Sequence, residues 1–510
     1  MAIDPRTPVL VGAGQYAHHA EGLDDALDPV GLMCVAIDRA RADAGLDALP
    51  DPDAIAVVSL LSWRYGDPAH FVAEQLGLKP TETLMTTAGG NSPQTLVNTT
   101  ARDIQDGRAD FVILTGGEAW RTRSKARKGG VELDWPRAAA DQLPRIVGEE
   151  LAMSHPAERA RGLFMPVQIY PMFETAIRHA AGRSVEEQLV VASELWSRFS
   201  AVAAANENAW RSVERSAEEI RTPTPTNRMI GFPYTKYMNS NNDVDMGAAL
   251  IMCSAERAEA LGIDRDRWVF VHAGTDCHEH AFLSNRWSFD RTPAIELGAR
   301  RALELAGMTI DDIDIVDLYS CFPSAVEMAL AELGVATDDP RGVTATGGLA
   351  YAGGPGNSYA MHGIAAVTER LRSNPGEKVG LTSGLGMAAT KHAFCVLSND
   401  PARVAAADGL SRKVALPSAL TTGPELVDET SGEGTIETYT VEFGREGTPA
   451  RTCIVVRFDD GRRTVANGSC SDAEVCALME SEGIGRRVRV VGGRAGEGES
   501  NIANRAELIG

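Results

Sequence analysis

Apolar residues in the first 410 or so positions gather in short runs, separated by longer stretches with helical periodicity. Residues 9–11, 54–60 and 111–115 are apolar runs of the kind that a strand covered on both faces requires. Residues 29–44 are expected to form a helix that Gly45 ends. Residues 91–105 keep one apolar face and open with a capping residue and an early proline. The pattern predicts strands alternating with helices.

The same order of elements returns later in the chain. We expect helices over residues 292–307, 323–334 and 358–372, and strands over 313–318 and 379–383. Alternation of this kind is typical of α/β layers with mostly parallel sheets. The sequence therefore predicts two α/β stretches that repeat one plan.

These two stretches cover residues 1–262 and 263–410, and the first holds an insertion at about 120–240. Within the insertion, Ser184 and Glu187 have the spacing of a capping box. The single apolar stripe on the helix that follows favours packing over a ligand site.

The pattern changes after residue 410. Residues 435–443 alternate with period two, and 452–458 lead into Asp459-Asp-Gly461, a hairpin signal. Residues 487–491 form a further strand. We expect residues 411–510 to be a separate small β-barrel of the OB type. Its arginines come without an aromatic ladder, which favours solvated strand faces over a nucleic-acid surface.

Composition narrows the possible functions. The 510 residues are 44% apolar and 23% charged, with a formal net charge of −21 that disfavours nucleic-acid binding. Apolar runs are shorter than a membrane span, and the N-terminus lacks a secretory pattern. The eight cysteines have no metal-ligand spacing. We expect a cytoplasmic protein with reduced thiols, no metal and no membrane or nucleic-acid partner.

The first predicted strand runs into Gly12-Ala-Gly14-Gln-Tyr-Ala17, which superficially fits a dinucleotide fingerprint. That motif needs an immediate helix and a second strand about twenty residues on. Here a polar loop follows, and the next strand waits until about Ala54. The glycines are therefore interpreted as allowing a tight exit from the strand.

Four glycine-rich or polar turns lie where predicted strands end or helices begin. Such turns converge at the carboxyl ends of strands, where α/β folds bind ligands, and helix starts offer free N–H groups. The turns are Thr87-Ala-Gly-Gly90-Asn-Ser-Pro93, Asp317-Leu-Tyr-Ser-Cys321-Phe-Pro323, Gly353-Gly-Pro-Gly-Asn-Ser358 and Ser383-Gly-Leu-Gly386.

At these turns the chain resembles the thiolase superfamily over about residues 1–400. The spacing from Gly89-Gly90 to Thr115-Gly-Gly-Glu118 is similar to the segment around that family's nucleophile. Asp317 to Phe322 resembles its H-D-C-F or N-E-A-F loop, and Gly353-Gly-Pro355 its G-H-P turn. The sterol-carrier-type branch is the most similar, and the extra domain resembles that of thiolase-like proteins type 1. The resemblance implies a duplicated five-layer α-β-α-β-α fold and acetyl-CoA acetyltransferase-like activity.

The resemblance also implies that the usual catalytic side chains are replaced. Gly90 stands where thiolases have the nucleophilic cysteine, and Gly354 where they have the histidine of G-H-P. Tyr319 stands at the histidine of H-D-C-F, and the C-x-G turn becomes Ser383-Gly-Leu-Gly386. Glycine can neither attack a thioester nor carry a proton.

Other residues are candidates to take over. Cys321 keeps the cysteine of the H-D-C-F loop and needs a neighbouring base, for which His362 and His392 are the surrogates; a core thiol and satisfied histidines are the alternative. The residues predicted to line a substrate pocket are Gly90, Asn91, Ser92, Tyr319, Gly354, Asn357, Ser358, Gly384 and Gly386.

Three functional hypotheses follow. The chain is an acyl-CoA-processing enzyme with an altered site, a non-catalytic binder of CoA or acyl-CoA, or a partner-dependent subunit of a lipid- or sterol-degrading complex. In all three, coenzyme A is the substrate or ligand and no other cofactor is expected. A monomer is favoured, with a homodimer as the alternative.

Overall fold

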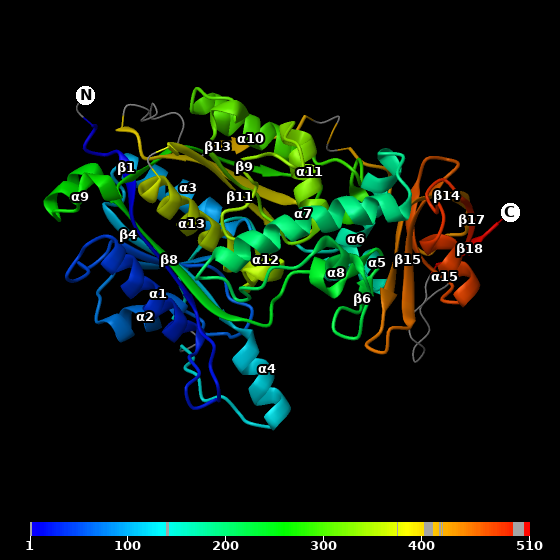
Figure 1. Ribbon diagram of the computed structural model, residues 1–510, viewed down its shortest axis with the longest axis horizontal. Coiled ribbons are helices and arrows are strands. Elements are labelled where there is room, and N and C mark those ends of the chain that lie inside the picture. The colour runs from blue at the N-terminus through cyan, green and yellow to red at the C-terminus, as the bar shows by residue number, and fades with distance from the viewer. Residues whose placement is uncertain are drawn as a thin grey trace.

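The first 400 residues fold into layers of helix and sheet (Figure 1). The computed structural model describes residues 3–138, 142–374, 376–401, 412–417, 420, 422–492 and 504–509. Two central helices lie between two sheet layers, and further helices cover each outer face. This is the five-layer arrangement that the resemblance implied.

The N-terminal half supplies one outer helix pair, one sheet layer and one central helix. Residues such as Ile37, Ile55 and Ile113 fill the core between its outer helices and its sheet. Its elements are β1 (Pro8–Ala17), α1 (Pro29–Asp43), β2 (Ala54–Val57), α2 (Pro68–Leu76), β3 (Glu82–Thr86), α3 (Ser92–Gln105), β4 (Phe111–Ala119), β8 (Asp245–Ser254) and α9 (Ala255–Ala260).

The C-terminal half repeats the plan and supplies the second central helix, α13. Its elements are β9 (Val269–His278), α10 (Pro293–Leu305), β10 (Ile315–Asp317), α11 (Pro323–Leu333), α12 (Gly348–Tyr351), α13 (Tyr359–Ser373), β11 (Val379–Gly386), β12 (Lys391–Ser398) and β13 (Arg412–Val414). Helices α3 and α13 contact each other and strands of both layers.

The sheets are mixed, so the expectation of mostly parallel strands is wrong. Among the described residues the strands join in the order β10-β11-β12-β9-β1-β8-β4-β2-β3-β5, with β13 on β9. The pairs β4–β8, β8–β1, β11–β12 and β12–β9 are antiparallel. Each half therefore adds antiparallel strands to a parallel core, and pairing of Val9 with Phe270 joins the halves.

The glycines near the N-terminus do not end the first strand, which corrects the interpretation of a tight exit. β1 continues through both of them to Ala17. A Cβ at Gly12 would lie 2.3 Å from the carbonyl oxygen of Ala40, and one at Gly14 would lie 2.1 Å from that of Ala36. These glycines therefore let α1 pack directly on the backbone of β1.

The insertion contributes helices on the C-terminal side of the layers and one strand at the far sheet edge. The predicted capping box of Ser184 and Glu187 is present at the start of its long helix, and the Leu195, Trp196 and Phe199 stripe is buried, as expected for packing. Its elements are α4 (Trp120–Gly129), β5 (Arg145–Val147), α5 (Pro156–Ala160), α6 (Pro166–Ala180), α7 (Val185–Ala205), α8 (Ala217–Arg221), β6 (Met229–Gly231) and β7 (Tyr234–Thr235).

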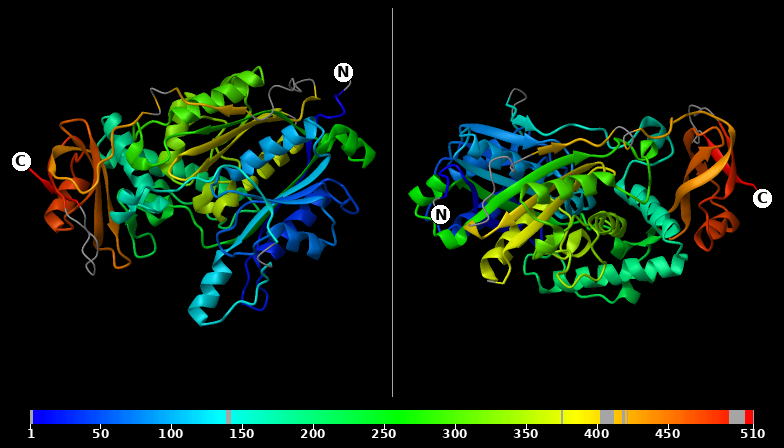
Figure 2. Two further views of the ribbon diagram at one scale, coloured as in Figure 1. Left: turned by 180° about the vertical axis from the view of Figure 1, so that it is seen from behind. Right: turned by 90° about the horizontal axis from the view of Figure 1, so that it is seen from above.

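A closed β-barrel occupies the C-terminal end of the molecule, beyond the insertion helices (Figure 2). Its strands close in the order β15-β16-β18-β17-β14-β15, and β6 of the insertion pairs with β14. Its elements are β14 (Gly432–Phe443), β15 (Pro449–Phe458), β16 (Arg463–Gly468), α15 (Asp472–Met479), β17 (Arg487–Val491) and β18 (Arg505–Leu508).

Arginines on the barrel surface are paired with acidic residues. Arg487 contacts Asp459, Arg489 contacts Glu433, and Arg457 contacts Glu437 at 2.9 Å. Neutralised side chains of this kind are typical of a solvated strand face rather than of a surface for phosphates. Among the described residues, none of the helices is both long and apolar enough to cross a membrane.

Candidate functional site

Three of the four predicted turns meet at the start of α3. A Cβ built on Gly90 would lie 2.2 Å from the hydroxyl oxygen of Tyr319 and 2.5 Å from the carbonyl oxygen of Leu385. One built on Gly384 would lie 2.8 Å from the Cα of Asn91. The turns after β3 and β10 are therefore in direct contact with the end of β11. The predicted turn Ser383-Gly-Leu-Gly386 is the last part of this strand and not a turn after it, which corrects the prediction.

The Tyr319 hydroxyl occupies the space that a side chain at position 90 would need. The Tyr319 backbone N–H donates to the Ser383 hydroxyl at 2.8 Å, and its ring meets the Tyr359 ring edge-on at 5.5 Å between centroids. Burial raises the pKa of Tyr319 well above its ordinary value, which keeps the phenol neutral. A neutral hydroxyl, and no nucleophile, stands at this point.

The fourth turn joins the cluster through Asn357. Its side-chain oxygen accepts from the Gly89 N–H at 3.0 Å, and its amide nitrogen donates to the Ser59 carbonyl at 2.8 Å. The Ser358 hydroxyl donates to the Pro355 carbonyl, so it stabilises its own turn. A Cβ at Gly354 would lie 2.9 Å from Asn242 Oδ1.

The side chains of Asn91 and Ser92 form hydrogen bonds to residues close to them in the sequence. Asn91 makes no side-chain capping bond to α3, so its predicted capping role is wrong; its Nδ2 donates to the Thr95 hydroxyl at 3.2 Å. Its Oδ1 is buried without a hydrogen-bond partner in the described part of the chain, close to Gly386. The Ser92 hydroxyl donates to the Thr87 carbonyl at 2.8 Å.

The three surrogate catalytic residues have separate hydrogen-bond partners. Cys321 is buried, and burial raises the pKa of its thiol to about 12. Nδ1 of His362 contacts Gln15 Oε1 at 3.0 Å, and Nε2 of His392 contacts the Ala389 carbonyl at 2.9 Å. Burial lowers the pKa of both histidines to about 4. In the residues that the structure describes, no hydrogen bond joins Cys321 to either histidine.

Sequence reasoning missed the residues that hold the turn between β11 and β12. Tyr170, in the insertion, donates to the Met387 carbonyl at 3.1 Å and accepts from the Ala389 N–H at 3.2 Å. Arg286 donates to the Ala389 carbonyl at 3.0 Å. These contacts link segments far apart in the sequence, so no local pattern signals them.

A cavity of about 310 Å³ adjoins the start of α3, and the predicted site residues Asn91 and Ser92 are part of its lining. Asp276 and Lys391 contribute charged groups to its wall, and the Lys391 ammonium donates to the Ala88 carbonyl at 3.0 Å. Further charged or titratable side chains and several threonine hydroxyls complete the lining, among them Arg145, Glu149, His278 and Lys413. Over the described ranges, no group of three or more His, Cys, Asp or Glu side chains is placed to hold a metal ion.

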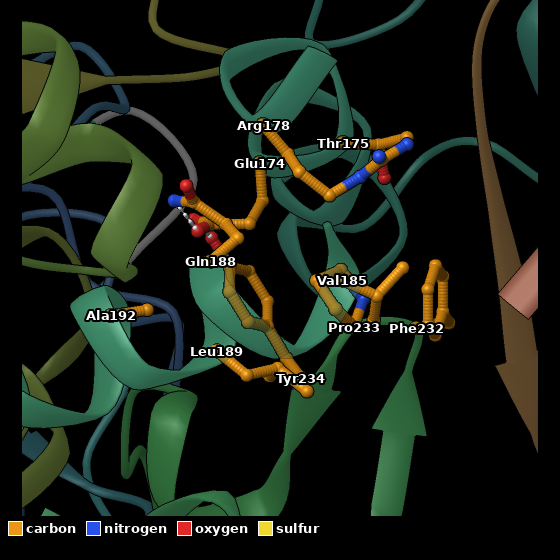
Figure 3. A pocket seen from close by; sticks show the side chains of 10 residues that line it. All are labelled: Glu174, Thr175, Arg178, Val185, Gln188, Leu189, Ala192, Phe232, Pro233 and Tyr234. Atoms are coloured by element: carbon orange, nitrogen blue, oxygen red, sulfur yellow. Dashed lines mark hydrogen bonds between the residues drawn. The ribbon is translucent and has the colours of Figure 1, made fainter. Parts of the chain in front are cut away.

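A buried carboxyl pair stabilises the start of α11, next to the turn that carries Tyr319. Figure 3 shows Gln188 of α7 reaching Glu174 of α6. The Gln188 amide donates to Glu174 at 2.6 Å and to Glu327 of α11 at 2.7 Å. The Tyr234 hydroxyl donates to Glu174 at 2.5 Å and accepts from the Ser324 N–H at 3.0 Å. Burial, and for Glu327 also the adjacent Glu174, raises the pKa of both carboxyls.

Comparison with known proteins finds a likeness to thiolase-like proteins type 1. The family model of the thiolase-like protein type 1 additional C-terminal domain matches residues 416–493. The crystal structure of a monomeric SCP2-thiolase-like protein type 1 from Mycobacterium smegmatis is 32% identical, with a TM-score of 0.82 and coverage of 100% of both chains.

More distant relatives carry enzyme names. The acetyl-CoA acetyltransferase of Methanothermobacter thermautotrophicus is 24% identical over 68% of this chain and 88% of its own length. The structure of the acetyl-CoA acetyltransferase from Syntrophomonas wolfei is 16% identical, with a TM-score of 0.57 over 78% of this chain and 100% of its own. At such identities the structural likeness concerns the fold.

Proposed function

The chain belongs to the family of SCP2-thiolase-like proteins type 1, and from this membership we propose that it binds CoA thioesters without thiolase chemistry. The observation that carries the proposal is the contact between Gly90 and Tyr319. Thiolase chemistry needs a sulfur nucleophile where Gly90 stands, and the Tyr319 hydroxyl fills the space for it. The site is therefore packed in a form that excludes the usual nucleophile.

The surrogate residues give no alternative route. A nucleophilic thiol must form a thiolate, which a neighbouring base or cation promotes. The pKa of Cys321 is raised to about 12, and its polar neighbour is the neutral hydroxyl of Tyr170. His362 and His392 interact elsewhere. We infer that Cys321 is a core thiol.

Two lines of support favour a CoA thioester as ligand. Relatives that share the fold are named acetyl-CoA acetyltransferases. The cavity beside the start of α3 also keeps polar groups, the Asn91 amide and the Lys391 ammonium among them, which are suited to hydrogen-bonding a thioester carbonyl. Polar groups without a nucleophile favour binding over turnover.

The test combines calorimetry and turnover on the full-length protein. We expect CoA and acetyl-CoA to bind in titration calorimetry, and no CoA release or consumption with acetyl-CoA and acetoacetyl-CoA in either reaction direction. Absence of binding to both ligands would reject the proposal.

If turnover is observed, a matched pair of variants tests whether the Cys321 thiol causes it. Cys321→Ala removes the surrogate thiol, whereas Cys395→Ala removes another buried cysteine, on β12. Turnover that Cys321→Ala abolishes and Cys395→Ala retains would replace the binding function with catalysis at Cys321.

A further inference from the structure

The turn between β11 and β12 contains two non-glycine residues in a strained backbone conformation. Met387 has φ 62° and Ala389 has φ 53°, in the left-handed region that non-glycine residues rarely adopt. Gly386, at the start of this turn, lies against Asn91 at the candidate site. Surrounding groups must therefore stabilise the turn for the site to keep its form.

Three buried side chains hold it: Tyr170, Arg286 and His392, whose Nε2 contacts the Ala389 carbonyl at 2.9 Å. Tyr170 bonds to both strained residues through its hydroxyl. Arg286 is 1% exposed and donates to the Ala389 carbonyl, while its second terminal nitrogen binds the Arg291 carbonyl and the Thr292 hydroxyl at 2.9 Å. Arg286 therefore helps to fix the position of the Ala389 carbonyl, together with His392.

The C-terminal barrel in turn fixes the segment that carries Arg286. Arg463 on β16 is fully buried, and its Nη1 donates to the carbonyls of Ser284 at 3.0 Å and Arg286 at 2.6 Å. Its guanidinium also lies 4.8 Å from the centre of the Phe289 ring. Gly423, ahead of the barrel, packs against the same segment, where a Cβ would lie 1.8 Å from the Asn285 carbonyl oxygen.

We propose that Arg463 is a positioning residue through which the C-terminal barrel fixes the turn at residues 386–391 of the candidate site. The path runs from Arg463 to the Arg286 backbone, from the Arg286 side chain to Ala389, and from that turn to Gly386. Removal of the guanidinium leaves the buried carbonyls of Ser284 and Arg286 without their hydrogen-bond donor. Because an unpaired buried carbonyl is costly, we expect residues 284–286 to shift. The inference holds whichever ligand the site takes.

The barrel offers a matched control. Arg457 and Arg463 both bind Glu437, at 2.9 and 2.6 Å, but only Arg463 donates to the segment at 284–286 in the described residues. The variants Arg463→Met and Arg457→Met each leave Glu437 with one arginine. They differ because only Arg463→Met removes the hydrogen bonds to the carbonyls of Ser284 and Arg286.

Hydrogen exchange of the full-length protein measures the effect. The Ala389 N–H bonds to Tyr170, and the Thr390 N–H bonds to the Gly386 carbonyl. In Arg463→Met we expect these two amides to exchange at least tenfold faster, while amides of β12 such as Phe394 keep their rates. In Arg457→Met all of them should keep their rates.

Three results would overturn the inference: unchanged exchange at Ala389 and Thr390 in Arg463→Met, an equal rise in β12, or the same rise in Arg457→Met. If Arg463→Met does not fold, Arg463→Lys replaces it, since one ammonium cannot hold Glu437 in a fork and both carbonyls as well. A turn that stays as protected as in the parent protein in Arg463→Lys would equally overturn it.

Discussion

At the scale of single residues, Gly90 and Tyr319 depend on each other, because the Tyr319 hydroxyl occupies the space that a side chain at position 90 would need. A Cβ at position 90 meets both the Tyr319 hydroxyl and the Leu385 carbonyl, so Gly90→Ala overpacks the site. We expect a loss of about 1–3 kcal/mol in the free energy of unfolding. In a Tyr319→Ala background the hydroxyl is gone and part of the loss disappears, with a coupling of about 1 kcal/mol by denaturant unfolding. Gly90→Ala combined with Tyr351→Ala is the control and should be additive.

Strict additivity of Gly90→Ala and Tyr319→Ala would contradict this coupling. The sequence predicts both positions, because the glycine turn and the family motif each mark them. Their contact could not be predicted, since it depends on how the turns after β3 and β10 approach each other. The same limit applies to Tyr170 and Arg286, whose partners at 387–389 lie in another part of the chain.

At the scale of elements, the alternation of strands and helices could be predicted, because the helices keep one apolar face and the strands covered on both faces are continuous apolar runs. The capping box at Ser184 and the C-terminal strands were also predicted and are present. Strand direction could not be predicted. A continuous apolar run indicates that a strand is covered on both faces, but not whether its neighbours are parallel or antiparallel. The length of β1 could not be predicted either. Gly12 and Gly14 let α1 pack on β1, and this contact between two elements leaves no local pattern in the sequence.

The junction of α6, α7 and α11 should make stability depend on pH. Glu327 has a raised pKa, so the folded chain keeps a proton that the unfolded chain releases, and stability falls as pH rises above the ordinary value of 4.5. Glu327→Gln keeps a polar group of the same shape without the titration. We expect its urea midpoint to decline less than that of the parent protein between about pH 5 and 9.

The control for that measurement is Glu304→Gln on α10, whose carboxyl is about half exposed and pairs with surface arginines. It should decline with pH as the parent protein does. An equal decline for Glu327→Gln would show that the carboxyl pair releases its proton without cost to the fold. Glu174, Gln188, Tyr234 and Arg183 are the groups that face or influence the pair.

At the scale of the whole molecule, we propose that the chain is a monomer. The insertion adds β5 to the edge of β3, and β5 is three residues long, as is β10 at the other end of the described sheet. Short edge strands offer little template for a second chain, and a net charge of −21 adds repulsion between copies. Light scattering after size exclusion should give about 54.4 kDa from about 1 to 100 μM protein. A mass near twice that value within this range would reject the monomer and place a partner chain against an edge or face that the fold leaves open.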